Sequence, residues 1–209
     1  MPHREVLMPQ TVHLFVFDTL ADWEPGFVVA GLNNAEGQKV PGRYQVRTVA
    51  ATREPITTIG GVRIQPDVSL DQVKPDASAM LILPGGESWD QGGNVEAVEK
   101  AKALLAAGTP VAAICGATAG LARGGVLDTR KHTSNAPEYL AATGYRGAHL
   151  YQAADVVSDG GVTTASAMKS LEFAREIFAR LDVYEDKVLE AWYGLFKTGD
   201  PRFYAALVG

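Results

Sequence analysis

Residues 111–120 read "VAAICGATAG" and contain the only cysteine of the chain. The apolar run before the cysteine predicts a buried strand, and the small residues of 116–125, which end in two glycines, predict a short helix. The chain would therefore pass from strand to helix at Cys115 and Gly116. Two interpretations of Cys115 are open at this point: a small core residue at the end of a buried strand, or a nucleophile presented at a sharp turn.

The segments on both sides of this turn alternate between strand and helix patterns. Apolar runs predict strands at 11–17, 44–50 and 79–86, the last of which ends in Pro-Gly-Gly. Helical spacing of apolar residues or terminal signals predict helices at 24–34, 94–108, 170–181 and 184–199, and glycine pairs predict hairpins within 55–67 and 154–166. Because apolar strands alternate with helices, the sequence predicts an α/β fold with a mostly parallel central sheet covered on both faces.

Composition narrows the class of protein. The length of 209 residues and the 46% hydrophobic content suit one globular domain, and a net charge of -5 without a basic cluster argues against nucleic acid as a partner. No apolar stretch approaches the roughly 20 residues that cross a bilayer, and the N-terminus lacks a secretory layout, so we expect a cytoplasmic protein. The spacing of Asp18, Glu87 and Asp90 matches no metal motif, and we expect neither metal nor cofactor.

Three loops should meet at one edge of this sheet, since ligands of such folds bind beyond the carboxyl ends of the strands. These are residues 18–24, 84–87 and the turn at Cys115. A sulfur above a helix N-terminus is expected to favour the thiolate form. The N–H groups of Gly86 and Gly116 are candidate donors to an oxyanion.

Glu24 is the carboxyl that we expect beside the cysteine. It could equally cap its own helix or lie in solvent, as a glutamate before proline commonly does. Near Cys115, it would either hold a thiolate as a protonated donor or act as a general acid and base with a raised pKa. His132 is the best-placed histidine after the cysteine, although histidines in polar loops are commonly structural.

Three stretches together resemble the ThiJ/PfpI superfamily, which includes the parkinsonism-associated deglycase family: "ILPGGESWD" (82–90), "VAAICGATAG" (111–120) and "VTTASAMKSLEFAREIF" (162–178). The resemblance runs from residue 11 to about 182. It implies a flavodoxin-like three-layer sandwich, shared with class I glutamine amidotransferase domains. We expect a single domain over 1–209, with its core at about 11–182 and a helical extension at 184–209.

The resemblance also implies roles for individual residues. In that superfamily the cysteine lies on a nucleophile elbow and bonds to a glutamate from the loop after the first strand, which here are Cys115 and Glu24. Protease-like members carry a histidine where this chain has Gly116, and the late His-x-Glu pair of glutamine amidotransferases is absent. Asn135 lies near the place of a histidine in deglycase-like members, so Asn135 and His132 are auxiliary candidates.

Two functional hypotheses follow. In the first, the protein is an enzyme whose Cys115 attacks a small electrophile, as a glyoxalase, deglycase or amidase would. In the second, it is a redox or stress-response protein without turnover, whose cysteine is oxidised; peptidase and glutamine-hydrolysing activities fit the departures less well. The resemblance implies a homodimer. Apolar residues of segment 184–199 either cover its interface or pack on their own chain: Trp192, Tyr193, Leu195 and Phe196.

Overall fold

A seven-stranded sheet forms the centre of the protein in the computed structural model, which describes residues 9–208. Its strand order is β5-β2-β1-β6-β7-β9-β8, and all neighbouring strands are parallel except the β8–β9 pair. The strands are β1 (Gln10–Phe15), β2 (Tyr44–Ala50), β5 (Val68–Ser69), β6 (Met80–Leu83), β7 (Val111–Ile114), β8 (Val156–Asp159) and β9 (Val162–Ala165). Every residue of β6 and β7 is buried, which explains their unbroken apolar sequences.

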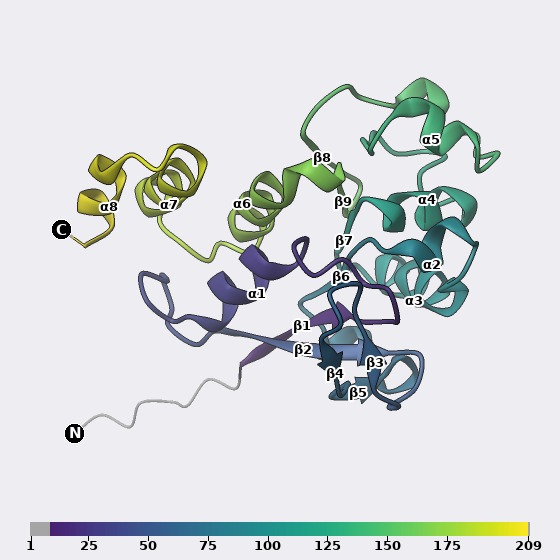
Figure 1. The fold of residues 1–209 in the computed structure, drawn as a ribbon, viewed down its shortest axis with the longest axis horizontal. Coiled ribbons are helices and arrows are strands. Elements are labelled where there is room, and N and C mark those ends of the chain that lie inside the picture. The colour runs from purple at the N-terminus through teal and green to yellow at the C-terminus, as the bar shows by residue number, and fades with distance from the viewer. Residues whose placement is uncertain (1–8, 209) are drawn as a thin grey trace.

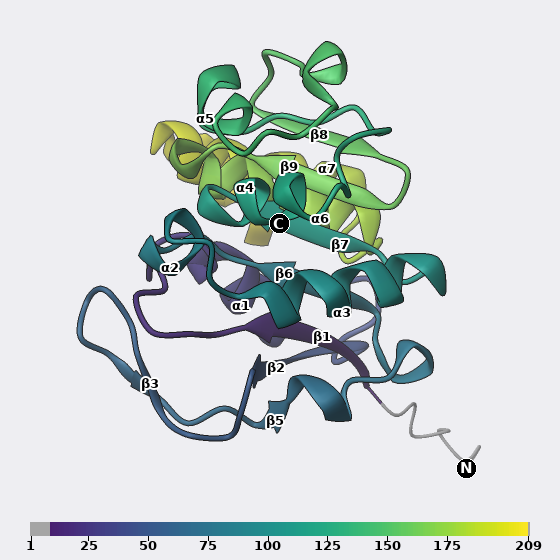
Figure 2. The same ribbon diagram turned by 90° about the vertical axis from the view of Figure 1, so that its right-hand side faces the viewer.

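Helices cover both faces of this sheet, as Figure 1 shows with the sheet seen edge-on. One face carries α1 (Gly26–Asn33) and α6 (Ser170–Arg180), and the other carries α2 (Glu87–Asp90), α3 (Val95–Ala106), α4 (Gly116–Arg123) and α5 (Pro137–Ala141). An outer pair, α7 (Asp186–Thr198) and α8 (Pro201–Val208), packs on α6 through α7. Figure 2 shows the strands stacked behind α3 and α4. The predicted flavodoxin-like α/β architecture is confirmed.

Both predicted hairpins are present. Strands β8 and β9 pair antiparallel across a turn at Gly160 and Gly161, which both have positive φ. Strands β3 (Ile56–Thr57) and β4 (Arg63–Ile64) form a separate two-stranded sheet. The loop of this small sheet packs against the chain after β1, because the Gly60 N–H donates to Asp22 Oδ2 at 2.8 Å.

Several short elements differ from the sequence-based prediction. Helix α1 begins at Gly26 with Pro25 in the N-cap position, two residues later than the predicted start at residue 24. Strand β5, helices α2 and α5, and four single-turn 3-10 helices at 70–72, 75–77, 148–150 and 167–169 are too short to show a period in the sequence. The segment predicted as a helical extension contains two helices, because Gly199 in a left-handed conformation ends α7 and Pro201 starts α8.

The described residues bear on two further expectations. No helix within residues 9–208 is long and apolar enough to cross a membrane. The expected domain begins at residue 1 and ends at residue 209, so its parts at 1–8 and 209 lie outside the described residues.

Candidate active site

Cys115 occupies a sharp turn between β7 and α4. Its φ of 57° and ψ of -125° are unusual for a residue with a side chain and cost about 1–3 kcal/mol, which the surrounding contacts must offset. The Cys115 N–H still donates to the Ala165 carbonyl of β9 at 3.0 Å, while the Cys115 carbonyl accepts from the Thr118 N–H at 3.1 Å. The backbone is thus held on the strand side and on the helix side, and Cys115, a partly exposed residue, lies at the turn.

The loops after β1 and β6 are joined to each other beside this turn. Ala21 N–H donates to the Gly85 carbonyl at 3.0 Å, and Leu20 and Gly86 form an antiparallel bridge. In return, the Gly85 N–H donates to Glu24 Oε2 at 2.5 Å. These bonds confirm that the two loops converge, and they fix the Glu24 carboxyl on the Gly85 backbone.

The side chains of Glu24 and Cys115 both lie directly against Gly85. A Cβ added at Gly85 would lie 2.6 Å from Cys115 Cβ, 2.8 Å from Glu24 Oε2 and 2.9 Å from Cys115 Sγ, so only glycine fits. Glu24 is fully buried, and its Oε1 has no hydrogen-bond partner among the described residues. The structure therefore brings the two residues together, and the carboxyl neither caps its helix nor lies in solvent.

Burial shifts the pKa of both groups upward. It raises the pKa of Glu24 to about 7, against the opposing effect of the Gly85 N–H and the Cys115 thiol. Burial first, and then the negative charge of Glu24, raise the pKa of Cys115 to about 12. This direction is opposite to the expected low-pKa thiolate, because desolvation and the carboxylate outweigh the donors Asn135 and Gly116. Both shifts favour the protonated forms, a thiol beside a carboxyl whose pKa is raised to about 7.

Of the two auxiliary candidates, Asn135 lies at the sulfur and His132 does not contact it. Asn135 Nδ2 donates to Cys115 Sγ at 3.5 Å, and its Oδ1 accepts from the Ala167 N–H at 2.9 Å. The fully buried His132 instead donates a hydrogen bond from Nδ1 to the Arg130 carbonyl at 2.7 Å, because a carbonyl oxygen can only accept. Its Nε2 accepts a hydrogen bond from the Tyr145 hydroxyl at 3.0 Å. Both ring nitrogens of His132 are engaged in structural bonds.

The glycines expected as oxyanion donors lie next to each other. The Gly116 N–H lowers the pKa of Cys115, against the larger effect of burial. A Cβ added at Gly116 would lie 3.1 Å from the Gly86 carbonyl oxygen, which places the two loops in close contact. Beneath them, the fully buried Trp89 donates from Nε1 to the Pro84 carbonyl at 2.8 Å and supports the β6 loop. That the N–H groups of Gly86 and Gly116 donate to an oxyanion stays a prediction.

Sequence reasoning missed one polar pair near the thiol. Tyr139 of α5 donates its hydroxyl proton to Asp90 Oδ1 of α2 at 2.5 Å. Burial, and then this bond to Asp90, raise the pKa of Tyr139, with a smaller contribution from the charge of a Cys115 thiolate. No local pattern marks Tyr139, because α5 reaches the site only through the folded loop that precedes it. Asp90, considered above as a metal ligand, is occupied by this tyrosine.

A strained cysteine at a strand–helix turn, with a buried glutamate from the loop after the first strand, defines a class of α/β proteins with a nucleophile elbow. The model of the DJ-1/PfpI family matches residues 10–180, and the chain belongs to this family.

Individual relatives agree with this assignment. The chain is 40% identical over 205 residues to a Bacillus subtilis protein named "Uncharacterized protease YoaZ", covering 97% of this chain and 98% of that one. The crystal structure of a thiJ/pfpI family protein from Bacillus anthracis is 42% identical, with a TM-score of 0.89 and 96% of both chains covered. A Caenorhabditis elegans protein named "Glutathione-independent glyoxalase DJR-1.2" is 29% identical over 145 residues, which are 68% of this chain and 76% of that one.

Proposed function

We propose that this protein is a cysteine-dependent enzyme that acts on small electrophilic carbonyl compounds, with Cys115 as nucleophile and Glu24 as its acid and base. The observation that carries the proposal is the fully buried Glu24 carboxyl over Gly85, where it faces the sulfur and has its pKa raised to about 7. A group with a pKa near the working pH is well suited to accept and return a proton. The glyoxalase name of one relative supports a reactive aldehyde as substrate.

The raised pKa of the thiol decides how Glu24 acts. Because Cys115 rests as a thiol, the Glu24 carboxylate accepts the sulfur proton while Sγ attacks the aldehyde carbon. The carbonyl oxygen gains negative charge, to which the N–H groups of Gly86 and Gly116 are the proposed donors. Glu24 then returns the proton to this oxygen, and a hemithioacetal results.

A 2-oxoaldehyde can react further with the same two residues. Glu24 moves the proton of C1 to C2, and the proton of the C1 hydroxyl passes to the C2 oxygen, so that C1 is oxidised to a thioester while the neighbouring ketone is reduced to an alcohol. Water then hydrolyses the thioester, which releases a 2-hydroxy acid and restores the Cys115 thiol. The balance is one aldehyde and one water to one acid, and no cofactor is required.

Peptidase and glutamine-hydrolysing mechanisms receive less support. Both rely on a histidine partner of the cysteine, and here Gly116 occupies the next position while His132 bonds to the Arg130 carbonyl. The residue that contacts the sulfur from the opposite loop is Asn135, whose amide cannot act as a base.

The test compares turnover of methylglyoxal by the unmodified protein, Cys115→Ser and Glu24→Gln, with lactate as the measured product. Glu54→Gln, at an exposed site on another loop, is the control. We expect lactate formation by the unmodified protein and the control, loss of turnover in Cys115→Ser, and a reduction by about 10²–10⁴-fold in Glu24→Gln. Peptide and amide substrates are assayed in parallel. Absence of cysteine-dependent turnover on all of them would overturn the proposal.

The redox hypothesis needs the same thiol but makes a different demand on it. Thiolates are the species that peroxide oxidises, so a pKa raised to about 12 predicts slow oxidation of Cys115. Mass spectrometry of the protein after hydrogen peroxide treatment measures this rate. Oxidation faster than that of free cysteine, together with no turnover, would favour the redox role over the enzymatic one.

A further inference from the structure

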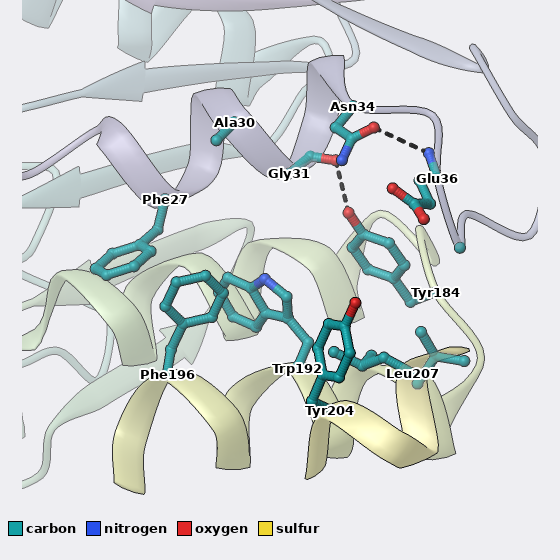
Figure 3. Close-up of a pocket in the computed structure, with 12 residues that line it drawn as sticks. Phe27, Ala30, Gly31, Asn34, Glu36, Tyr184, Trp192, Phe196, Tyr204 and Leu207 are labelled. Atoms are coloured by element: carbon teal, nitrogen blue, oxygen red, sulfur yellow. Dashed lines mark hydrogen bonds between the residues drawn. The ribbon is translucent and has the colours of Figure 1, made fainter. Parts of the chain in front are cut away.

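A pocket lies between α1, α7 and α8 (Figure 3). Its volume is about 370 Å³, within the range of small-molecule sites. The α1 side contributes Phe27, Ala30 and Gly31, and the segment after α1 contributes Asn34, Glu36 and Gly37; the opposite wall is Tyr184, Val188, Trp192, Phe196, Tyr204 and Leu207. Neither Glu24 nor Cys115 lines it, so it is separate from the proposed active site.

Contacts within the protein hold the aromatic walls in place. Trp192 packs edge-on against Phe178 of α6 at 5.1 Å between ring centroids, so this residue packs on its own chain. Phe196 lies 5.3 Å from the rings of both Phe27 and Trp192. A preformed set of rings of this kind loses little conformational entropy when a ligand binds.

Two tyrosines complete the enclosure from opposite sides. Tyr184 donates its hydroxyl proton to the Gly31 carbonyl at 2.7 Å, which fixes its ring below the end of α1. Tyr204 of α8 is 58% exposed, so its ring stands at the open side of the pocket. A ligand could therefore enter beside Tyr204 without disturbing the buried wall.

The charge of the pocket is one-sided. None of the twelve lining residues is lysine or arginine, and Glu36 carries the only charge among them. Figure 3 shows the Glu36 carboxylate at the rim beside the Tyr184 ring. Its backbone N–H is occupied by Asn34 Oδ1 at 3.2 Å, which ties the segment back to the end of α1. Aromatic ring faces are themselves negative, so the walls and the rim both favour a positive ligand.

We propose that this pocket binds a small organic cation, an ammonium group attached to an aryl or branched alkyl body. The rings of Trp192, Phe196 and Tyr204 contact the apolar body of the ligand, and their faces attract its positive charge. Glu36 forms an ion pair with the ammonium group. An anion would meet a carboxylate and ring faces with no basic partner among the lining residues. This inference does not depend on the proposed enzymatic activity.

The probe is benzyltrimethylammonium, titrated by calorimetry into the full chain, with phenylacetate as an anion of similar size. We expect one site for the cation and binding of phenylacetate at least about tenfold weaker. Glu36→Gln should weaken cation binding by about tenfold, and Tyr204→Ala should weaken it as well. Glu138→Gln on α5 is the matched surface control and should bind as the unmodified protein does, as should Cys115→Ser.

Three results would overturn the proposal: no cation binding at millimolar probe, equal binding of phenylacetate, or unchanged binding in Glu36→Gln. The pocket could instead be covered by a second copy of the chain. Light scattering on the same samples measures whether the protein is a dimer and so distinguishes this case from binding of a small molecule. A dimer that Tyr204→Ala dissociates and that excludes the probe would assign the pocket to self-association and refute the small-molecule site. Because Glu36 and Tyr204 are exposed, their variants are expected to fold.

Discussion

Replacing the buried carboxyl by an amide, Glu24→Gln, should change the pH dependence of stability by an amount that follows from the site. The pKa of Glu24 is raised from 4.5 to about 7 in the folded protein, chiefly by burial. An acid with a raised pKa favours the folded state below its unfolded pKa, and this contribution is lost as pH rises through the folded value. The unmodified protein should therefore lose stability between about pH 4.5 and pH 7.

The size of this loss follows from the shift. At 1.36 kcal/mol for each pKa unit, a rise from 4.5 to about 7 corresponds to about 3 kcal/mol. Glutamine keeps an oxygen for the Gly85 N–H but carries no charge at any pH. The difference in unfolding free energy between Glu24→Gln and the unmodified protein should thus rise by about 2–3 kcal/mol from pH 5 to pH 8, because part of the loss already occurs below pH 5.

Urea unfolding at pH 5 and pH 8, followed by tryptophan fluorescence, measures the difference. His13 and His132, whose pKa values burial lowers, are present in both proteins and cancel from the comparison. Glu54→Gln, at an exposed glutamate, should show no pH-dependent gain. A stability difference between Glu24→Gln and the unmodified protein that stays constant from pH 5 to pH 8 would refute a raised Glu24 pKa.

Three further substitutions test the packing around the site. Gly85→Ala places a Cβ 2.6 Å from Cys115 Cβ and should abolish turnover and cost about 1–3 kcal/mol, whereas Gly26→Ala, with nothing within 4 Å, should leave activity and melting temperature nearly unchanged. Asn135→Ala removes one donor to the sulfur and should lower kcat by about five- to tenfold without lowering the melting temperature, as steady-state kinetics and calorimetry would show. Gly120→Ala places a Cβ 2.4 Å from the indole ring of Trp89 and should cost about 1–3 kcal/mol of unfolding free energy. A thermal scan should show this as a melting temperature lower by several degrees.

The central strands and the elbow were predictable from the sequence because their patterns reflect burial directly. Strands β6 and β7 are apolar at every position since both of their faces are covered, and Cys115 follows β7 with a glycine that allows the helix to start at once. The pairing of Glu24 with Cys115 was expected from topology and resemblance, and the Gly85 N–H provides the bond that holds the carboxyl in place.

Other properties depend on three-dimensional contacts that no local pattern carries. The helix N-terminus suggested a thiolate, but burial and the carboxylate reverse the sign of the shift at Cys115. His132 and Asn135 were both candidates for a residue beside the sulfur. The backbone of His132 forms a parallel β-bridge with Tyr151 and its side chain is buried, whereas the Asn135 side chain accepts a hydrogen bond from the Ala167 N–H and lies at the sulfur. Which of the two faces the site is decided by the fold of their loop, and residue type alone does not reveal it.

The most direct test of the Glu24–Cys115 pair is a thiolate titration by ultraviolet absorbance, in which the chain contributes one cysteine and Cys115→Ser supplies the background from its seven tyrosines. We predict no thiolate signal in the unmodified protein up to about pH 10, since the pKa of Cys115 is raised to about 12. In Glu24→Gln the titration should move to lower pH, because the negative neighbour is gone. A thiolate that forms below pH 8 in the unmodified protein, with no change in Glu24→Gln, would contradict the account.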